Sequence, residues 1–143
     1  MNMFWVIFTI ITTVISIYFL YLFSNRIAIE IPKKCHLWNN QNLKHDDLIK
    51  SLNTIKIFED DAHLIRKVLK CKICNQLYFY EMVEYIDYKN GKDPIYRTWI
   101  PIKNINTAVK LSKLSSLSFL TYSSIRIDFP EDIEKPTEPY FVE

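Results

Sequence analysis

Residues 77–102 read LYFYEMVEYIDYKNGKDPIYRTWIPI, and this stretch decides the fold. Its first half, Leu77–Tyr88, is rich in aromatic residues, which favour a β-strand. The dipeptide Asn90-Gly91 follows, and this pair is the strongest short-range signal for a hairpin turn. Ile95–Ile102 then returns as the partner strand. We therefore predict an antiparallel pair of strands at the centre of a small domain.

Two or three helices are expected around this pair. Asp46–Leu52 opens with acidic residues. Glu59–Leu69 has acidic residues at its start and basic residues at its end, an arrangement that suits the helix dipole. A third helix is expected over Thr107–Leu117, where Asn104 or Asn106 can supply the N-terminal cap.

Further strands are expected on either side of the pair. Arg26–Ile31 alternates isoleucines and is stopped by Pro32, and Thr121–Phe129 also alternates apolar residues. The last stretch, residues 130–143, combines prolines with acidic residues and predicts a loose tail. The fold class is therefore expected to be α+β, with an antiparallel sheet and two or three helices on one side of it.

An uncharged run, MFWVIFTIITTVISIYFLYLF, occupies residues 3–23. As a helix it would be about 32 Å long, enough to cross a hydrocarbon core of about 30 Å. Neither Met1 nor Asn2 is basic and no small-residue cleavage site follows the run, so it does not have the pattern of a secretory signal. We therefore expect one uncleaved N-terminal transmembrane helix.

The basic residues near this run predict its orientation. Arg26, Lys33 and Lys34 follow it, whereas only the α-amino group precedes it. Because basic residues stay on the cytoplasmic side, the remainder of the chain is expected in the cytoplasm. The expected organisation is a transmembrane helix (3–23), a juxtamembrane strand and linker (24–45), a small α+β domain (46–129) and an acidic, proline-containing tail (130–143).

The charge balance and the glycine content exclude several classes of function. The chain has 18 basic and 16 acidic residues, a net charge of +2, and no nucleic-acid partner is expected from this balance. Gly91 is its one glycine. Phosphate-binding loops, dinucleotide fingerprints and nucleophile elbows all need glycines for close backbone approach. We therefore expect neither a nucleotide-binding enzyme nor an α/β-hydrolase.

Cys71 and Cys74 form the one local motif that carries chemistry. Two thiolates at this spacing can bind one metal ion. A redox dithiol would begin at a helix N-terminus, whereas here a helix is expected before the pair and a strand after it. This order resembles half of a rubredoxin-type zinc knuckle. Asn75 stands where glycine is usual, and asparagine also tolerates left-handed backbone geometry.

A structural zinc site needs four protein ligands, and the sequence holds no second C-x-x-C motif. Cys35 with the adjacent His36 is one complement, and His45 and His63 are others. Two chains could also pool their cysteine pairs. Thiols that are merely buried and reduced, with no cofactor, are the alternative. The ligand set expected for a single zinc ion is Cys71, Cys74, Cys35 and His36.

The stretch Cys71–Ile102 is similar to a segment of small bacterial proteins, through CxxCNQLYFYE followed by IDYKNGKDPIYRTWIP. Some of those proteins resemble immunity proteins that accompany secreted toxins. The resemblance implies binding rather than catalysis and carries no catalytic residues. With the apolar run, it predicts a single-pass protein of the bacterial inner (cytoplasmic) membrane.

We therefore expect a membrane-anchored protein-binding module, an inhibitor or immunity protein whose partner is a toxin domain. Aromatic side chains give rigid contact area at an interface. A homodimer is a further possibility, and neither catalytic residues nor an organic cofactor are expected. The residues expected to contact a partner are Tyr78, Tyr80, Tyr96 and Trp99.

The alternatives are a small membrane-bound metal-dependent enzyme and a zinc-knuckle structural protein. For an enzyme, Glu81, Glu84 and Asp87 are candidate acid/base groups, with His63 nearby in the sequence. Glu81 and Asp87 would share one face of a strand, and Glu84 would point the other way. A solvated strand face would explain the same charges without chemistry.

Overall fold

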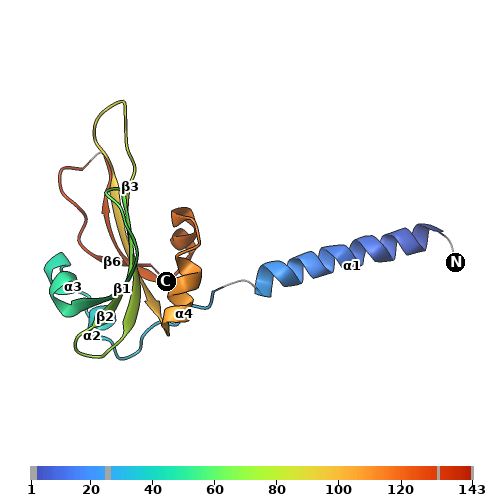
Figure 1. Cartoon of the computed structure of the whole chain (residues 1–143), viewed down its shortest axis with the longest axis horizontal. Helices are drawn as coiled ribbons and strands as arrows, with labels where there is room; N and C mark the ends of the chain where they lie inside the picture. The colour runs from blue at the N-terminus through green and yellow to red at the C-terminus, as the bar shows by residue number, and fades with distance from the viewer. Residues whose placement is uncertain (1–2, 25–26, 132, 143) are drawn as a thin grey trace.

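The computed structural model describes residues 3–24, 27–131 and 133–142. These residues form a helix followed by a small α+β domain (Figure 1). The elements are α1 (Met3–Ser24), α2 (His36–Asn39), α3 (His45–Ser51), β1 (Leu52–Asp60), β2 (Leu64–Cys71), β3 (Leu77–Glu84), β4 (Ile95–Ile102), α4 (Ile105–Leu111), the 3-10 helix η1 (Ser116–Thr121), β5 (Ser124–Phe129) and β6 (Tyr140–Val142).

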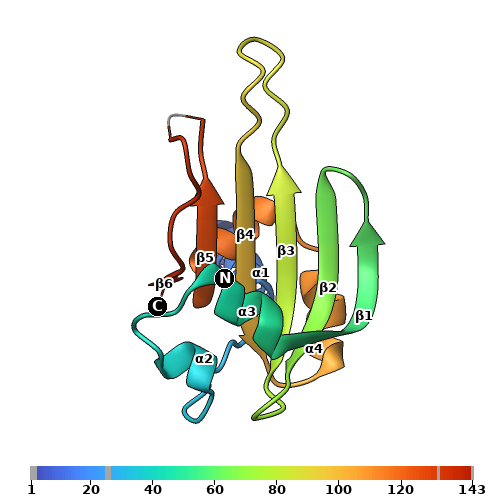
Figure 2. The ribbon, with the colours of Figure 1, turned by 90° about the vertical axis from the view of Figure 1, so that its left-hand side faces the viewer.

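The domain is built on a six-stranded antiparallel sheet in which every strand pairs with the next one along the chain (Figure 2). The predicted pair, β3 and β4, lies at its centre and pairs from Leu77 opposite Ile102 to Glu84 opposite Ile95. Pro101 lies opposite Tyr78, beyond the last pair that joins β4 to β5. Its missing N–H therefore costs the sheet no hydrogen bond on the β5 side.

Helices cover both faces of this sheet, not one face as expected from the sequence (Figure 2). On one face, α2 and α3 pack over a core that includes Tyr78, Trp99 and Ile125. On the other, α4 and η1 cover a second core around Phe79 and Ile100. Both faces of the central strands are therefore buried. This explains why β3 carries aromatic residues at consecutive positions.

A row of polar side chains crosses the second face. The register places Arg66 opposite Glu81, Glu81 opposite Thr98, and Thr98 opposite Arg126. Residues directly opposite one another in antiparallel strands share a face, so the whole row lies under α4 and η1. Arg66, Glu81 and Arg126 are all buried. Both Nε and Nη2 of Arg66 lie 2.7 Å from Oε2 of Glu81.

The two arginines of the row attach the covering segment to the sheet. Arg66 Nη1 donates to the Ser112 carbonyl at 2.8 Å, and Arg126 Nη2 donates to the Phe119 carbonyl at 2.6 Å. Among the described residues, no buried side-chain nitrogen or oxygen lacks a hydrogen-bond partner. The burial of these charges is thus compensated, as a covered sheet requires.

The prediction of a helix over Glu59–Leu69 is wrong. Its residues form the end of β1, a short turn and most of β2. In β2 the polar-row face carries Arg66 and Val68, and the opposite face carries Ile65 and Leu69. A strand buried on both faces shows no simple alternation of apolar and polar residues, so its pattern resembles a helical stripe.

Three other expectations differ from the structure in detail. Residues 27–31 form no strand, and Arg26 lies outside the described residues; Ile27 and Ile29 pack against the second core instead. The helix expected over Thr107–Leu117 is the shorter α4, followed by η1. The stretch expected to be a loose tail ends in β6, which pairs with β5.

The helix cap predicted at Asn104 is confirmed, because its side chain accepts the Thr107 N–H at 3.0 Å.

The helix expected over residues 3–23 is present as α1. Its described side chains, those of residues 7–20, are all exposed. The hydroxyls of Thr12, Thr13 and Ser16 donate to backbone carbonyls one turn earlier. Among the helices in the part of the chain that the structure describes, none is both long and apolar enough to cross a membrane.

The β3–β4 loop contains the expected turn at Asn90-Gly91 within a wider connection between the two strands. Gly91 has a φ of +64°, whereas Asn90 is not left-handed. The Gly91 N–H donates to the Asp87 carbonyl at 3.0 Å. The Asp87 carboxylate accepts from the Lys89 N–H at 2.9 Å and from the Asn90 N–H at 3.2 Å. Only Gly91 therefore needs the left-handed region in this turn.

We predict that Gly91→Val lowers the free energy of unfolding by about 1–2 kcal/mol, because a β-branched residue is strained at positive φ. Gly91→Asn should cost less than half as much, since asparagine tolerates this geometry. No atom lies within 4 Å of an added Cβ, so the difference reports backbone strain rather than a clash. Thermal denaturation of the full chain measures both variants, and equal effects of Val and Asn would contradict the turn assignment.

Candidate metal centre

The four residues expected to bind zinc lie together in the structure. Cys35 and His36 come from the start of α2, and Cys71 and Cys74 from the turn between β2 and β3. One ligand atom from each residue lies within 4.8 Å of all the others. Cys35 and Cys71 are buried, and His36 and Cys74 are partly exposed. Segments far apart in the sequence therefore contribute one candidate site.

The turn between β2 and β3 has the geometry of a metal knuckle. The Cys71 N–H donates to the Gln76 carbonyl at 2.8 Å, and the Asn75 N–H donates to the Cys71 carbonyl at 3.1 Å. Asn75 has a φ of +61°. Asparagine thus occupies the left-handed position at which glycine is usual. The presence of Asn75 in place of the usual glycine therefore leaves the turn intact.

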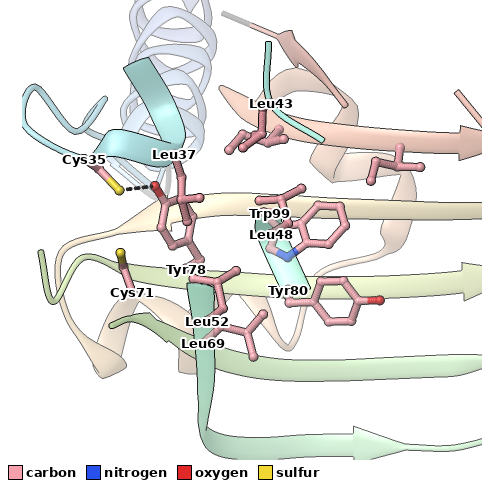
Figure 3. Packing of buried hydrophobic residues seen from close by; sticks show 12 residues of the cluster. Cys35, Leu37, Leu43, Leu48, Leu52, Leu69, Cys71, Tyr78, Tyr80 and Trp99 are labelled. Atoms are coloured by element: carbon pink, nitrogen blue, oxygen red, sulfur yellow. Dashed lines mark hydrogen bonds between the residues drawn. The ribbon is translucent and has the colours of Figure 1, made fainter. Parts of the chain in front are cut away.

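The other half of the site is formed where the chain enters α2. The Cys35 carbonyl accepts the N–H groups of Trp38 and Asn39, both at 3.1 Å. Leu37 is buried in the core beneath this turn. Cys35 therefore points toward the sheet, where the Tyr78 hydroxyl donates to its Sγ at 3.1 Å (Figure 3).

The separations between the ligand atoms suit a small tetrahedral ion. Zinc binds sulfur at about 2.3 Å and imidazole nitrogen at about 2.0–2.1 Å, which places ligand atoms about 3.8 Å apart around a tetrahedron. His36 Nδ1 already lies 3.7 Å from Cys71 Sγ. The widest separations, up to 4.8 Å, need a contraction of about 1 Å. The cluster could therefore hold a metal ion such as zinc.

The thiols of the C-x-x-C pair differ in acidity. Burial raises the pKa of Cys71, but hydrogen bonds from the backbone of Cys74 and Ile73 outweigh it and leave the pKa below its ordinary value. Burial raises the pKa of Cys74 to about 12. Burial and the contact with Cys35 also raise the pKa of Tyr78, so its hydroxyl remains a neutral donor to sulfur. Donors of this kind orient and stabilise metal-bound sulfur.

The site adjoins an open cleft of about 490 Å³. Cys35 and Cys74 line it together with residues 30–34, which lead from α1 toward α2. An ion can therefore reach the partly exposed side of the cluster from solvent, while Cys71 lies on its buried side.

The other histidines lie elsewhere. Among the described residues, neither His45 nor His63 belongs to the cluster. His45 lines a separate cavity beside α3. His63 Nδ1 lies 2.8 Å from a carboxylate oxygen of Glu84, as a surface pair.

Most of the residues expected to contact a partner are core residues. Tyr78, Tyr80 and Trp99 are only 1%, 9% and 3% exposed, because α2 and α3 cover the face of the sheet on which they lie. Tyr96 is half-buried in a crevice on the opposite face. Three of these four aromatic side chains therefore build the fold instead of presenting contact area.

Each acid considered for catalysis has a partner in the structure. Glu81 is paired with Arg66, Glu84 with His63, and Asp87 accepts backbone N–H groups in the β3–β4 loop. The sequence analysis does not single out Arg66 or Arg126, the two arginines of the polar row. Neither has a clear sequence signal: Arg66 is followed by Lys67 in β2, and Arg126 alternates with Ile125 and Ile127 as a residue on a solvated strand face would.

Comparison with known protein families, with characterised proteins and with solved structures finds no match to this chain. The assignment of the site therefore depends on the geometry and chemistry of these residues.

We predict that the full chain, purified in detergent without chelator, carries one zinc ion per chain. His36→Ala should weaken zinc binding by more than about tenfold, since even contacts outside the ligand set contribute that much. His45→Ala, which removes another half-buried histidine, should leave binding unchanged. Elemental analysis and competition with a chromophoric chelator measure both quantities. Folded protein without metal would contradict the prediction, and one ion per two chains would indicate a site shared between chains.

Proposed function

We propose that this chain is a membrane-anchored protein-binding domain in which a structural zinc ion fixes the junction between anchor and domain. The observation that carries the proposal is the cluster of Cys35, His36, Cys71 and Cys74. A site with four protein ligands leaves no open position for substrate, and such closed sites are structural. The binding energy of the ion then contributes to folding.

The position of the cluster supports this role. Ile27 and Ile29 pack against the core on one face of the sheet, whereas Cys35 belongs to the core on the other. The segment between them therefore passes around the end of the sheet. Its hydrogen bonds include one from the Asn39 side chain to the Lys33 carbonyl, at 3.1 Å. A zinc ion would hold the far end of this segment to the β2–β3 turn.

The membrane part of the proposal is supported by the apolar run over residues 3–23. The described side chains of α1, those of residues 7–20, are all exposed. Thr9, Thr12, Thr13 and Ser16 lie along one side of the helix, where the hydroxyls of Thr12, Thr13 and Ser16 donate to its own backbone carbonyls. A helix without charged residues, whose few hydroxyls are bonded to its own backbone, needs apolar surroundings, either lipid or a partner. We propose the cytoplasmic membrane of a bacterium, with the domain on the cytoplasmic side.

The protein-binding part is supported by the small size of the domain and by the structural partners of its candidate acids. A toxin domain is the proposed partner, following the sequence resemblance. With Tyr78, Tyr80 and Trp99 in the core, the contact area has to come from other residues. Large apolar side chains are exposed around the β3–β4 loop, among them Tyr85, Ile86 and Tyr88. These are the residues that we propose for a partner interface.

We predict that removal of zinc from the full chain speeds tryptic cleavage after Lys33 and Lys34 by about tenfold or more. Both lysines are exposed and immediately precede Cys35, so release of Cys35 and His36 frees the backbone that trypsin must unfold. Cleavage after Lys89 and Lys92, exposed residues of the β3–β4 loop, should not change. Mass spectrometry of the fragments measures both sites in one digest.

His36→Ala should reproduce the effect of the chelator, and His45→Ala should not. Equal acceleration at both pairs of lysines would show that zinc stabilises the whole domain rather than the junction. Unchanged cleavage after Lys33 and Lys34 would show that zinc does not hold the junction between anchor and domain.

We also predict that a reporter fused after Glu143 is active only as a cytoplasmic reporter, because Arg26, Lys33 and Lys34 follow the apolar run. The fused protein should remain in the membrane fraction after alkaline extraction, and a variant lacking residues 1–23 should not. An active alkaline phosphatase fusion would place the domain outside the cytoplasm and would overturn the proposed orientation.

A further inference from the structure

Two exposed leucines lie on the same side of η1. Leu117 and Leu120 are 68% and 59% exposed, whereas Phe119 between them is buried in the second core. Residues three apart in a 3-10 helix lie one above the other, so these two side chains form one apolar ridge. They also line the crevice in which Tyr96 lies. Adjacent leucines that are this exposed are typical of a surface that meets an apolar partner.

The segment that contains this ridge is basic. Residues 103–123 include Lys103, Lys110 and Lys113 but neither aspartate nor glutamate, although the whole chain has 16 acidic residues against 18 basic ones. The three lysines are exposed, and among the described residues none of them forms an ion pair. The outer side of α4 and η1 therefore combines apolar contact area with free positive charge.

The acidic residues that line the crevice beside the ridge do not offset these lysines. Glu81 is buried and paired with Arg66. The Asp128 carboxylate accepts the Tyr140 hydroxyl, and Tyr140 also contacts Arg126, so the charges at that end balance. Both acids are thus engaged within the domain.

The basic surface continues toward the junction with α1. Lys103 lines the cleft of about 490 Å³ together with Lys33 and Lys34 of the segment that leads to α2. Glu30 also lines it, so one acid stands there against three lysines. The two groups of lysines therefore belong to one positive region.

The chain from α1 enters the domain on this same side. Ile27 and Ile29 pack against the second core, and they share a cavity of about 420 Å³ with residues 121–123, where η1 ends. Two residues separate Ile27 from Ser24, the last residue of α1. At 3.8 Å between successive Cα atoms, this stretch spans at most about 11 Å. In Figure 1, α1 accordingly leaves the domain on the side on which α4 lies.

The position of the ridge is fixed before any contact. Arg66 Nη1 donates to the Ser112 carbonyl before η1, and Arg126 Nη2 donates to the Phe119 carbonyl within it. These bonds hold η1 to the sheet, so its leucines need no ordering when they meet a partner. A surface that is ordered in advance binds at a lower entropic cost.

We propose that the outer side of α4 and η1 lies against an anionic lipid bilayer. Leu117 and Leu120 enter the headgroup region, and the lysines of residues 103–113 contact lipid phosphates. The inference rests on the proposed anchoring by α1, because a tether of about 11 Å brings this side of the domain to the membrane surface. It adds a second contact, which sets the orientation of the domain on the bilayer.

The test uses the full chain at one copy per lipid nanodisc, in discs of phosphatidylcholine alone and in discs with equal parts of phosphatidylcholine and phosphatidylglycerol. Hydroxyl-radical footprinting with mass spectrometry measures oxidation of Leu117 and Leu120 relative to Ile57 in β1, which is 55% exposed. We expect the anionic lipid to lower this ratio at least about fivefold, since one lysine at an anionic surface shifts the contact equilibrium by about that factor. Equal ratios in the two kinds of disc would overturn the proposal.

Two matched pairs of substitutions locate the contact. Lys110→Gln combined with Lys113→Gln should raise the oxidation ratio in the anionic discs at least about fivefold, because two of the lysines of the segment are lost. Lys89→Gln combined with Lys92→Gln removes the same charge from exposed positions in the β3–β4 loop and should leave the ratio unchanged. Equal effects of the two pairs would contradict a contact through α4 and η1.

Size-exclusion chromatography distinguishes a failure of this contact from a failure of the anchor. A chain that does not co-elute with the discs would contradict the membrane anchor and the lipid contact together. A chain that co-elutes but gives equal oxidation ratios in both kinds of disc would leave the anchor intact and overturn the lipid contact alone.

Discussion

Both faces of the sheet are covered, and this constraint determines where charged residues can stand in its strands. A charge in the middle of a covered strand has no water, so it needs a partner in the protein. Arg66 and Glu81 meet this need through their ion pair, and Arg66 and Arg126 also bind carbonyls of the covering segment. A slip of one residue between strands would move these charges to the opposite face, among Tyr80 and Trp99. The polar row therefore fixes the register of the central strands and the position of η1 together.

The parts of the fold that the sequence predicts are those set by local chemistry. Asn90-Gly91 marks the connection between the central strands because glycine alone adopts a left-handed φ there without strain. Asn104 marks a helix start because its side chain satisfies a backbone N–H. The candidate ligands Cys71 and Cys74 are recognisable by their spacing, and the need for four ligands made Cys35 with His36 one of the complements to look for.

The remaining features depend on contacts between distant segments. β2 reads as a helix because Arg66 hides the alternation of a strand whose two faces are both buried. The aromatic residues of β3 look available for a partner because the sequence does not show that α2 and α3 return across them. The pairing of Arg66 with Glu81 follows from the register of β2 and β3. No local signal encodes that register.

The candidate metal centre and the crevice lie at opposite ends of β3 and on opposite faces of the sheet. Cys71 and Cys74 precede β3 and face the core under α2, whereas Val83 and Tyr85 mark its far end under η1. The strands between them are held by the polar row, so a change at one end need not reach the other. A metal ion at the first end would hold the segment that follows α1. The second end, with the exposed side chains of Leu117 and Leu120, lies farther along the strands from that junction.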